Sequence, residues 1–165
     1  MSLNKNDSTG TTTSTSQPNP LGIRRIDHVA WTVPDLNAVI DFYQRVIGAQ
    51  LLYQLGPIDA RDIPSDADGR DWTEAHVAVK DGRLSLALLA LPGGGKLELF
   101  EYQRPASTTT APLRSNHIGS HHLGFEVEDI DTAAQWLQDN GCTAMQRIAF
   151  AEGPTAGSQF QYFLD

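Results

Sequence analysis

The stretch HVAWTVPDL at residues 28–36 returns in altered form as HLGFEVEDI at residues 122–130. In both stretches histidine stands first, an aromatic residue fourth and an aspartate eighth, so the offset between the copies is constant. Residues with helical spacing follow each stretch, and each helical pattern ends at a glycine, Gly48 or Gly141. The two copies match in their strand, their helix cap, their helix and the glycine that ends the helix. This agreement indicates an internal repeat. The sequence therefore predicts two copies of one βαβββ-type unit.

The first copy is the easier one to divide into elements. The alternation of apolar residues and the positions of proline and glycine predict a hairpin around Asp81-Gly82 and polar loops at 57–71 and 103–120. A helix is expected over 36–47, and strands over 23–33, 49–55, 72–79, 83–91 and 96–102. We expect modules at about 22–102 and 119–165, joined by a linker at 103–118, and a disordered tail at 1–21, which is rich in Ser, Thr, Asn and Pro.

Composition excludes several classes of function. The net charge is −8, with 12 basic and 20 acidic residues, and no cluster of Lys or Arg marks a nucleic-acid or anionic membrane surface. Cys142 is the single cysteine, which excludes an internal disulfide and a cysteine metal cluster. The N-terminus lacks the apolar segment of a signal peptide. These features favour a cytoplasmic protein that acts on a small-molecule substrate.

Three ionisable side chains share one predicted face. Because side chains alternate along a strand, the apolar residues of each strand pack under a helix, while His28, Glu98 and His122 face the other way. An unpaired buried ionisable group costs roughly 2–7 kcal/mol, and a shared divalent metal removes that cost for all three. Glu101 has the opposite parity and is expected as a surface charge at the strand end. His121 also fails this parity test and is expected to face solvent or a loop.

Five motifs carry a resemblance to the vicinal oxygen chelate superfamily, which includes glyoxalase I, methylmalonyl-CoA epimerase, extradiol dioxygenases and bleomycin- and fosfomycin-resistance proteins. They are IDHVA at 26–30, DFYQRVIG at 41–48, LELFE at 97–101, HHLGFEV at 121–127 and FQYFLD at 160–165. The resemblance implies an α+β fold in which two tandem βαβββ modules form a curved, sheet-lined cleft. It also implies that a metal in this cleft is bound by His28, Glu98 and His122.

One family ligand is not among the 165 residues. In the superfamily a fourth ligand, usually a glutamate that often also transfers protons, follows an Asp-Pro-x-Gly motif on the final strand. The sequence ends at Asp165, where that motif would begin. We therefore expect that the second module lacks its last strand and that the chain is truncated.

The resemblance implies a metal-dependent isomerase or lyase of the glyoxalase or epimerase type. Zn, Ni, Co, Mn and Fe all suit mixed nitrogen and oxygen ligands. A substrate chelated to the metal would lose a proton next to its carbonyl, and Glu98 is the residue placed to carry that proton. Glutamate at this position is typical of glyoxalase-like members and glutamine of epimerase-like ones, whereas the long linker favours the epimerases.

Two other functions remain open. The ligand types also suit an extradiol-type Fe(II) dioxygenase, and a metal-free protein could bind a small molecule, for example an antibiotic, in the same cleft. Arg114 is a candidate to bind a carboxylate or phosphate of the substrate. Proteins of this superfamily commonly form dimers, and an unpaired sheet edge in the truncated second module also favours a homodimer.

Overall fold

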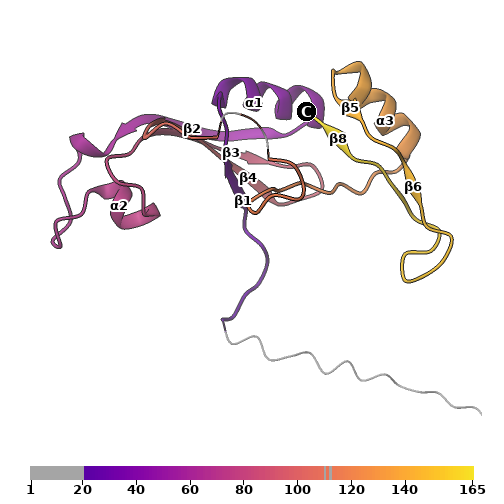
Figure 1. Ribbon diagram of the computed structural model, residues 1–165, viewed down its shortest axis with the longest axis horizontal. Coiled ribbons are helices and arrows are strands. Elements are labelled where there is room, and N and C mark those ends of the chain that lie inside the picture. The colour runs from indigo at the N-terminus through magenta and orange to yellow at the C-terminus, as the bar shows by residue number, and fades with distance from the viewer. Residues whose placement is uncertain (1–20, 110, 112) are drawn as a thin grey trace, which may run out of the picture.

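The computed structural model describes residues 21–109, 111 and 113–165 (Figure 1). Nearly all of the predicted tail at 1–21 lies outside the described residues. The fold is α+β and contains a curved sheet with α1 against one of its faces, which confirms the predicted fold class (Figure 1). None of the helices in the described residues has the length and apolar character that crossing a membrane requires.

The first module has the predicted βαβββ order. Its sheet has the strand order β1-β4-β3-β2, in which β1 runs parallel to β4 and the other neighbours are antiparallel. A parallel pair needs a long crossover, which α1 and the two strands after it supply. The bounds are β1 Val29–Thr32, α1 Leu36–Phe42, a π-helical turn at Tyr43–Ile47, β2 Gln50–Asp59, β3 Arg83–Ala90 and β4 Lys96–Arg104.

The helical segment formed by α1 and the π-helical turn begins and ends where the sequence predicts, at Leu36 and Ile47. The Asp35 carboxylate accepts a hydrogen bond from the Ala38 amide at 2.9 Å, and the chain leaves the helical segment at Gly48 with φ of +78°. A second cap corrects the prediction for Glu101, because its Oε2 accepts the Leu36 amide at 2.8 Å. Glu101 lies on the helix-facing side of β4, as its parity requires, and satisfies an orphan amide there rather than standing at the surface.

The core lies between α1 and the sheet. Leu97 and Leu99 on β4 are fully buried, and Leu36 and Ile40 of α1 pack in the same cluster. This burial confirms that the odd-numbered positions at the start of β4 face the helix. Glu98 therefore lies on the opposite face of the sheet.

The predicted strand at 72–79 is wrong, because residues Trp72–Val77 form the helix α2. Asp71 caps this helix: one of its carboxylate oxygens accepts the Glu74 amide at 2.9 Å and the other accepts the Asp81 amide at 2.8 Å. Thr73 is fully buried and its hydroxyl accepts the Gly82 amide at 2.9 Å. These local hydrogen bonds favour a helix over the strand that the alternation of apolar residues predicts. The turn at Asp81-Gly82 therefore follows a helix and does not join the two strands of a hairpin. The expected loop at 57–71 also begins later, because β2 runs to Asp59 and is followed by a 3₁₀ turn at Ala60–Asp62.

Asp71→Asn should loosen this region. Hydrogen bonds from the Asp81 and Glu74 amides lower the pKa of Asp71 from 3.8 to about 2. Since the pKa is depressed in the folded state, the stabilisation is present above pH 3.8 and is lost as the pH falls through about 2. The protection factors of the two amides against hydrogen exchange should be lower in the variant at neutral pH, and in the parent protein they should fall only in acid. Equal exchange in both proteins at neutral pH would contradict this role.

The second module matches its prediction only in part. Helix α3, Ile130–Asp139, is present and Asp129 caps it by accepting the Thr132 amide at 2.6 Å. The strand expected at 122–127 pairs with no other strand in the described chain, and Phe125 and Val127 are exposed. Four two-residue strands follow in two pairs, β5 Thr143–Ala144 with β8 Phe163–Leu164 and β6 Ile148–Ala149 with β7 Gln159–Phe160.

Side-chain contacts join the second module to the π-helical turn at Tyr43–Ile47 and to β1. The Trp136 indole N–H of α3 donates to the Val46 carbonyl at 2.9 Å, and Arg45 donates to Asn140 at 2.8 Å. His121 is exposed in a loop, as predicted, and its ring packs on Trp31 with the ring centroids 4.5 Å apart. Both rings therefore belong to the junction between the modules.

Candidate metal centre

The pairing of β1 with β4 brings two predicted ligands together. Val29 lies opposite Leu97 and Ala30 opposite Glu98 in this parallel ladder. His28 precedes β1 by one residue, and its Nε2 lies 3.5 Å from Glu98 Oε2. The Glu98 side chain is 20% exposed and that of His28 is 42% exposed, so the pair lies at the border between protein and solvent.

Two neighbours that sequence reasoning missed complete the surroundings of His28. Asp27 Oδ2 lies 3.1 Å from His28 Nδ1, and Lys96 Nζ lies 2.8 Å from the same oxygen. Hydrogen bonds from Lys96 and His28 lower the pKa of Asp27 to about 2. Asp27 precedes β1, which begins at Val29, so strand alternation does not fix the direction of its side chain. The sequence offered one signal of this arrangement: Lys96 is the first residue of the strand that lies beside the Asp27–His28 pair.

The third predicted ligand lies elsewhere. The His122 ring packs edge-on against Tyr162, with centroids 5.5 Å apart. Within the described residues, no three His, Cys, Asp or Glu side chains gather closely enough to hold a metal ion. The structure thus unites His28 with Glu98 and leaves His122 apart from them. Metal binding by the three stays a prediction.

Arg114 is exposed and lies in the turn at 114–117, where its carbonyl accepts the His117 amide at 2.8 Å. This contact involves the backbone alone. It shows how the turn is built, and the role of the guanidinium toward a substrate stays a prediction.

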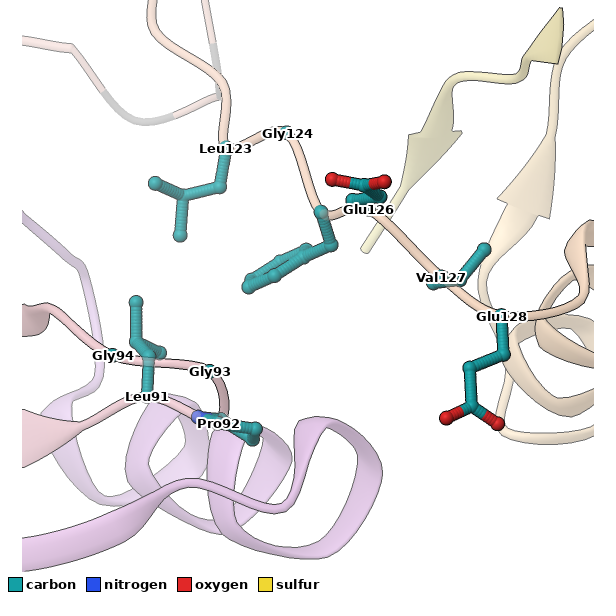
Figure 2. Close-up of a pocket in the computed structure, with 10 residues that line it drawn as sticks. Leu91, Pro92, Gly93, Gly94, Leu123, Gly124, Glu126, Val127 and Glu128 are labelled. Atoms are coloured by element: carbon teal, nitrogen blue, oxygen red, sulfur yellow. The ribbon is translucent and has the colours of Figure 1, made fainter. Parts of the chain in front are cut away.

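A cleft of about 560 Å³ lies between the turn after β3 and the start of the second module (Figure 2). Its apolar wall includes Leu91 and Leu123, which point toward one another in Figure 2 and also pack against the core. Glu126 and Glu128 place two carboxylates at its border. The residues that line this cleft do not include His28, Glu98 or His122.

The donor chemistry of the His28–Glu98 pair fits a divalent transition metal. An imidazole nitrogen and a carboxylate oxygen that face one another suit Zn, Ni, Co, Mn or Fe. Glu98 lies on β4, and His28 comes directly before β1, which pairs with β4. The pair alone supplies two ligands.

Comparisons with known proteins agree with this fold. The family model of the Glyoxalase/Bleomycin resistance protein/Dioxygenase superfamily matches residues 27–162. Solved structures with similar folds include a glyoxylase/bleomycin resistance protein/dioxygenase domain from Frankia sp. EAN1pec, at TM-score 0.57 and 19% identity over 86% of this chain and 88% of that one. A glyoxalase family protein from Bacillus cereus also has TM-score 0.57, with 21% identity over 82% of this chain and 85% of that one.

Two curated relatives are epimerases by name. The 2-epi-5-epi-valiolone epimerase of Actinomyces sp. is 36% identical over 86% of this chain and 74% of its own length. The ethylmalonyl-CoA/methylmalonyl-CoA epimerase of Cereibacter sphaeroides is 28% identical over 74% of this chain and 75% of its own length. These names support a function of the isomerase type. With its fold and the match over residues 27–162, the chain belongs to the Glyoxalase/Bleomycin resistance protein/Dioxygenase superfamily.

Proposed function

We propose that this protein is a metal-dependent epimerase that moves a proton next to a carbonyl group of a small substrate. The observation that carries the proposal is the His28–Glu98 pair, whose facing atoms are 3.5 Å apart on the face of the sheet opposite the core. The two epimerase relatives support this reaction class over a lyase or a dioxygenase.

The chemistry follows from the residue types. A bound divalent metal would polarise the substrate carbonyl and make the adjacent C–H bond more acidic. Glu98 removes that proton, and the configuration inverts when a water molecule from solvent donates a proton to the opposite face of the carbon. His28 would supply an imidazole nitrogen as a ligand to the metal. His122 is proposed as the third ligand, which requires the start of the second module to come closer to the pair.

The charges near the pair favour an uncharged substrate. A coenzyme A thioester carries phosphate groups, which need lysine or arginine partners. Lys96, the lysine beside His28, is already bound to Asp27 at 2.8 Å, and the whole chain has a net charge of −8. We therefore infer that a polyhydroxylated ketone such as 2-epi-5-epi-valiolone suits this site better than an acyl-CoA.

The test is an exchange experiment in D₂O with metal-loaded protein. We expect 2-epi-5-epi-valiolone to gain deuterium at the carbon beside its carbonyl as the epimer forms, and we expect a chelator to abolish both changes. Methylmalonyl-CoA should react far more slowly. If the ketone binds with no exchange and the protein takes up no metal, the protein is a metal-free binding protein.

Arg114→Ala separates the two substrate classes. If the guanidinium binds an anionic group, its loss should raise KM for a coenzyme A thioester by about tenfold, which corresponds to one charge-assisted hydrogen bond. KM for the uncharged ketone should not change, because that substrate has no group for the arginine to bind. Steady-state kinetics of Arg114→Ala and of the parent protein with both substrates measure this difference. A rise in KM for the ketone would place Arg114 at a polar group of that substrate instead.

We also propose a homodimer. Strand β1 is the outer strand of its sheet, and its other edge has no partner strand in the described chain. The apolar residues Ile26 and Val29 are exposed along this edge. Unpaired edges with apolar side chains usually become covered. Light scattering at micromolar protein concentration should give twice the 18.0 kDa chain mass, and a monomer mass would contradict the proposal.

A further inference from the structure

We propose that Asp27 is a positioning residue that fixes the tautomer of His28. In this arrangement Nδ1 carries the proton and Nε2 keeps its lone pair toward Glu98. The inference rests on the proposed function where it concerns the metal, because the free Nε2 is the atom that would bind it.

The two nitrogens of His28 have different partners at different distances. Nδ1 lies 3.1 Å from Asp27 Oδ2, within the usual range of an N–H···O hydrogen bond. Nε2 lies 3.5 Å from Glu98 Oε2, which is longer than that range. A carboxylate has only acceptors, so the short contact requires a proton on Nδ1. The neutral imidazole then has no proton on Nε2.

The sheet holds Asp27 in this position through Lys96. The Lys96 ammonium lies 2.8 Å from the same carboxylate oxygen that accepts from His28. Lys96 is the first residue of β4, next to Leu97, which pairs with Val29 across the ladder. Arg25 also approaches Asp27, at 3.9 Å, but its side chain is 79% exposed, so it adds little.

The four side chains therefore form a series of contacts that runs from Lys96 through Asp27 and His28 to Glu98. In metal sites, a carboxylate on the outer nitrogen of a ligating histidine fixes the ring and raises its basicity, and its loss typically lowers affinity by about 10–100-fold. An ordinary surface ion pair would instead leave the tautomer and the affinity unchanged when it is removed. This difference can be measured.

The first measurement uses the metal-free full chain with ¹⁵N-labelled histidine. Nitrogen chemical shifts of His28 should report the Nδ1–H tautomer in the parent protein and a shift toward Nε2–H in Asp27→Ala. Asp27→Asn should keep the Nδ1–H form, because its amide oxygen still accepts that proton. An Nε2–H tautomer in the parent protein, or no shift in Asp27→Ala, would overturn the inference.

The second measurement is a zinc titration by calorimetry. Asp27→Ala should bind zinc about 10–100-fold more weakly than the parent, and Asp27→Asn should fall between them. The matched control is Asp41→Asn, since Asp41 is also an exposed carboxylate beside a basic residue, Arg45, but lies on α1. Its affinity should equal that of the parent. Equal affinity in Asp27→Ala would overturn the role toward the metal.

The two proposals fail in distinguishable ways. If the parent protein binds no zinc, nickel, cobalt or manganese, the proposed function fails, while the tautomer experiment still decides the role of Asp27. If the metal binds and the tautomer does not respond to Asp27→Ala, the positioning role fails and the proposed function stands.

Discussion

Glu98→Gln should reduce epimerisation by about 10²–10⁴-fold, the usual contribution of a positioned acid–base group. Glutamine has nearly the same size and keeps an oxygen that can bind a metal, but it cannot accept the substrate proton. Metal affinity should therefore fall much less than turnover. Deuterium exchange of the ketone in D₂O and a zinc titration of the same variant measure the two effects separately.

The matched control is Glu101→Gln, the same change three residues along the same strand. Glu101 lies on the helix-facing side and caps the Leu36 amide, a bond that glutamine can also accept. Activity should remain close to that of the parent. If Glu98→Gln were as active as the parent, Glu98 would serve only as a ligand, as the glutamine at this position in epimerase-like members implies, and the proton would need another base.

The face on which His28 and Glu98 lie could be predicted because it depends on few assumptions. Alternation along β4 is fixed by Leu97 and Leu99, both fully buried against α1. The parallel ladder then sets Ala30 beside Glu98 and brings His28 to the same face. Asp35 and Asp129 each cap a helix by accepting a hydrogen bond from an amide three residues along the chain. Because these contacts are local, both helices begin where the sequence indicated.

Prediction failed where a local bond competes with a pattern. Residues 72–77 alternate weakly, but the carboxylate of Asp71 and the hydroxyl of Thr73 bind nearby amides and favour a helix. Both are short polar side chains, and they determine a backbone geometry that apolar periodicity does not report.

The position of His122 could not be derived for a different reason. Strand parity says which way a side chain faces only if the strand is paired, and residues 122–127 pair with no strand in the described chain. The repeat therefore indicated a shared supersecondary unit without placing one unit against the other. The contacts that place it, Trp136 with Val46 and His121 with Trp31, join residues about 90 apart in sequence.

Leu99→Ala should lower the free energy of unfolding by about 2–5 kcal/mol, the usual cost of removing a fully buried leucine side chain. Leu99 is 0% exposed and packs in the cluster that joins α1 to β3 and β4. Its loss leaves a cavity between the helix and the sheet, which the paired strands cannot collapse to fill. Urea unfolding followed by circular dichroism measures the change.

Leu52→Ala is the matched control, because Leu52 lies on β2 of the same sheet but is 45% exposed. It should cost about 0.5 kcal/mol or less. Since Leu99 faces away from Glu98, the folded fraction of Leu99→Ala should keep the zinc affinity of the parent. Equal losses of stability in the two variants would contradict the location of the core. Loss of zinc binding in the folded fraction of Leu99→Ala would show that the His28–Glu98 pair depends on helix packing on the opposite face.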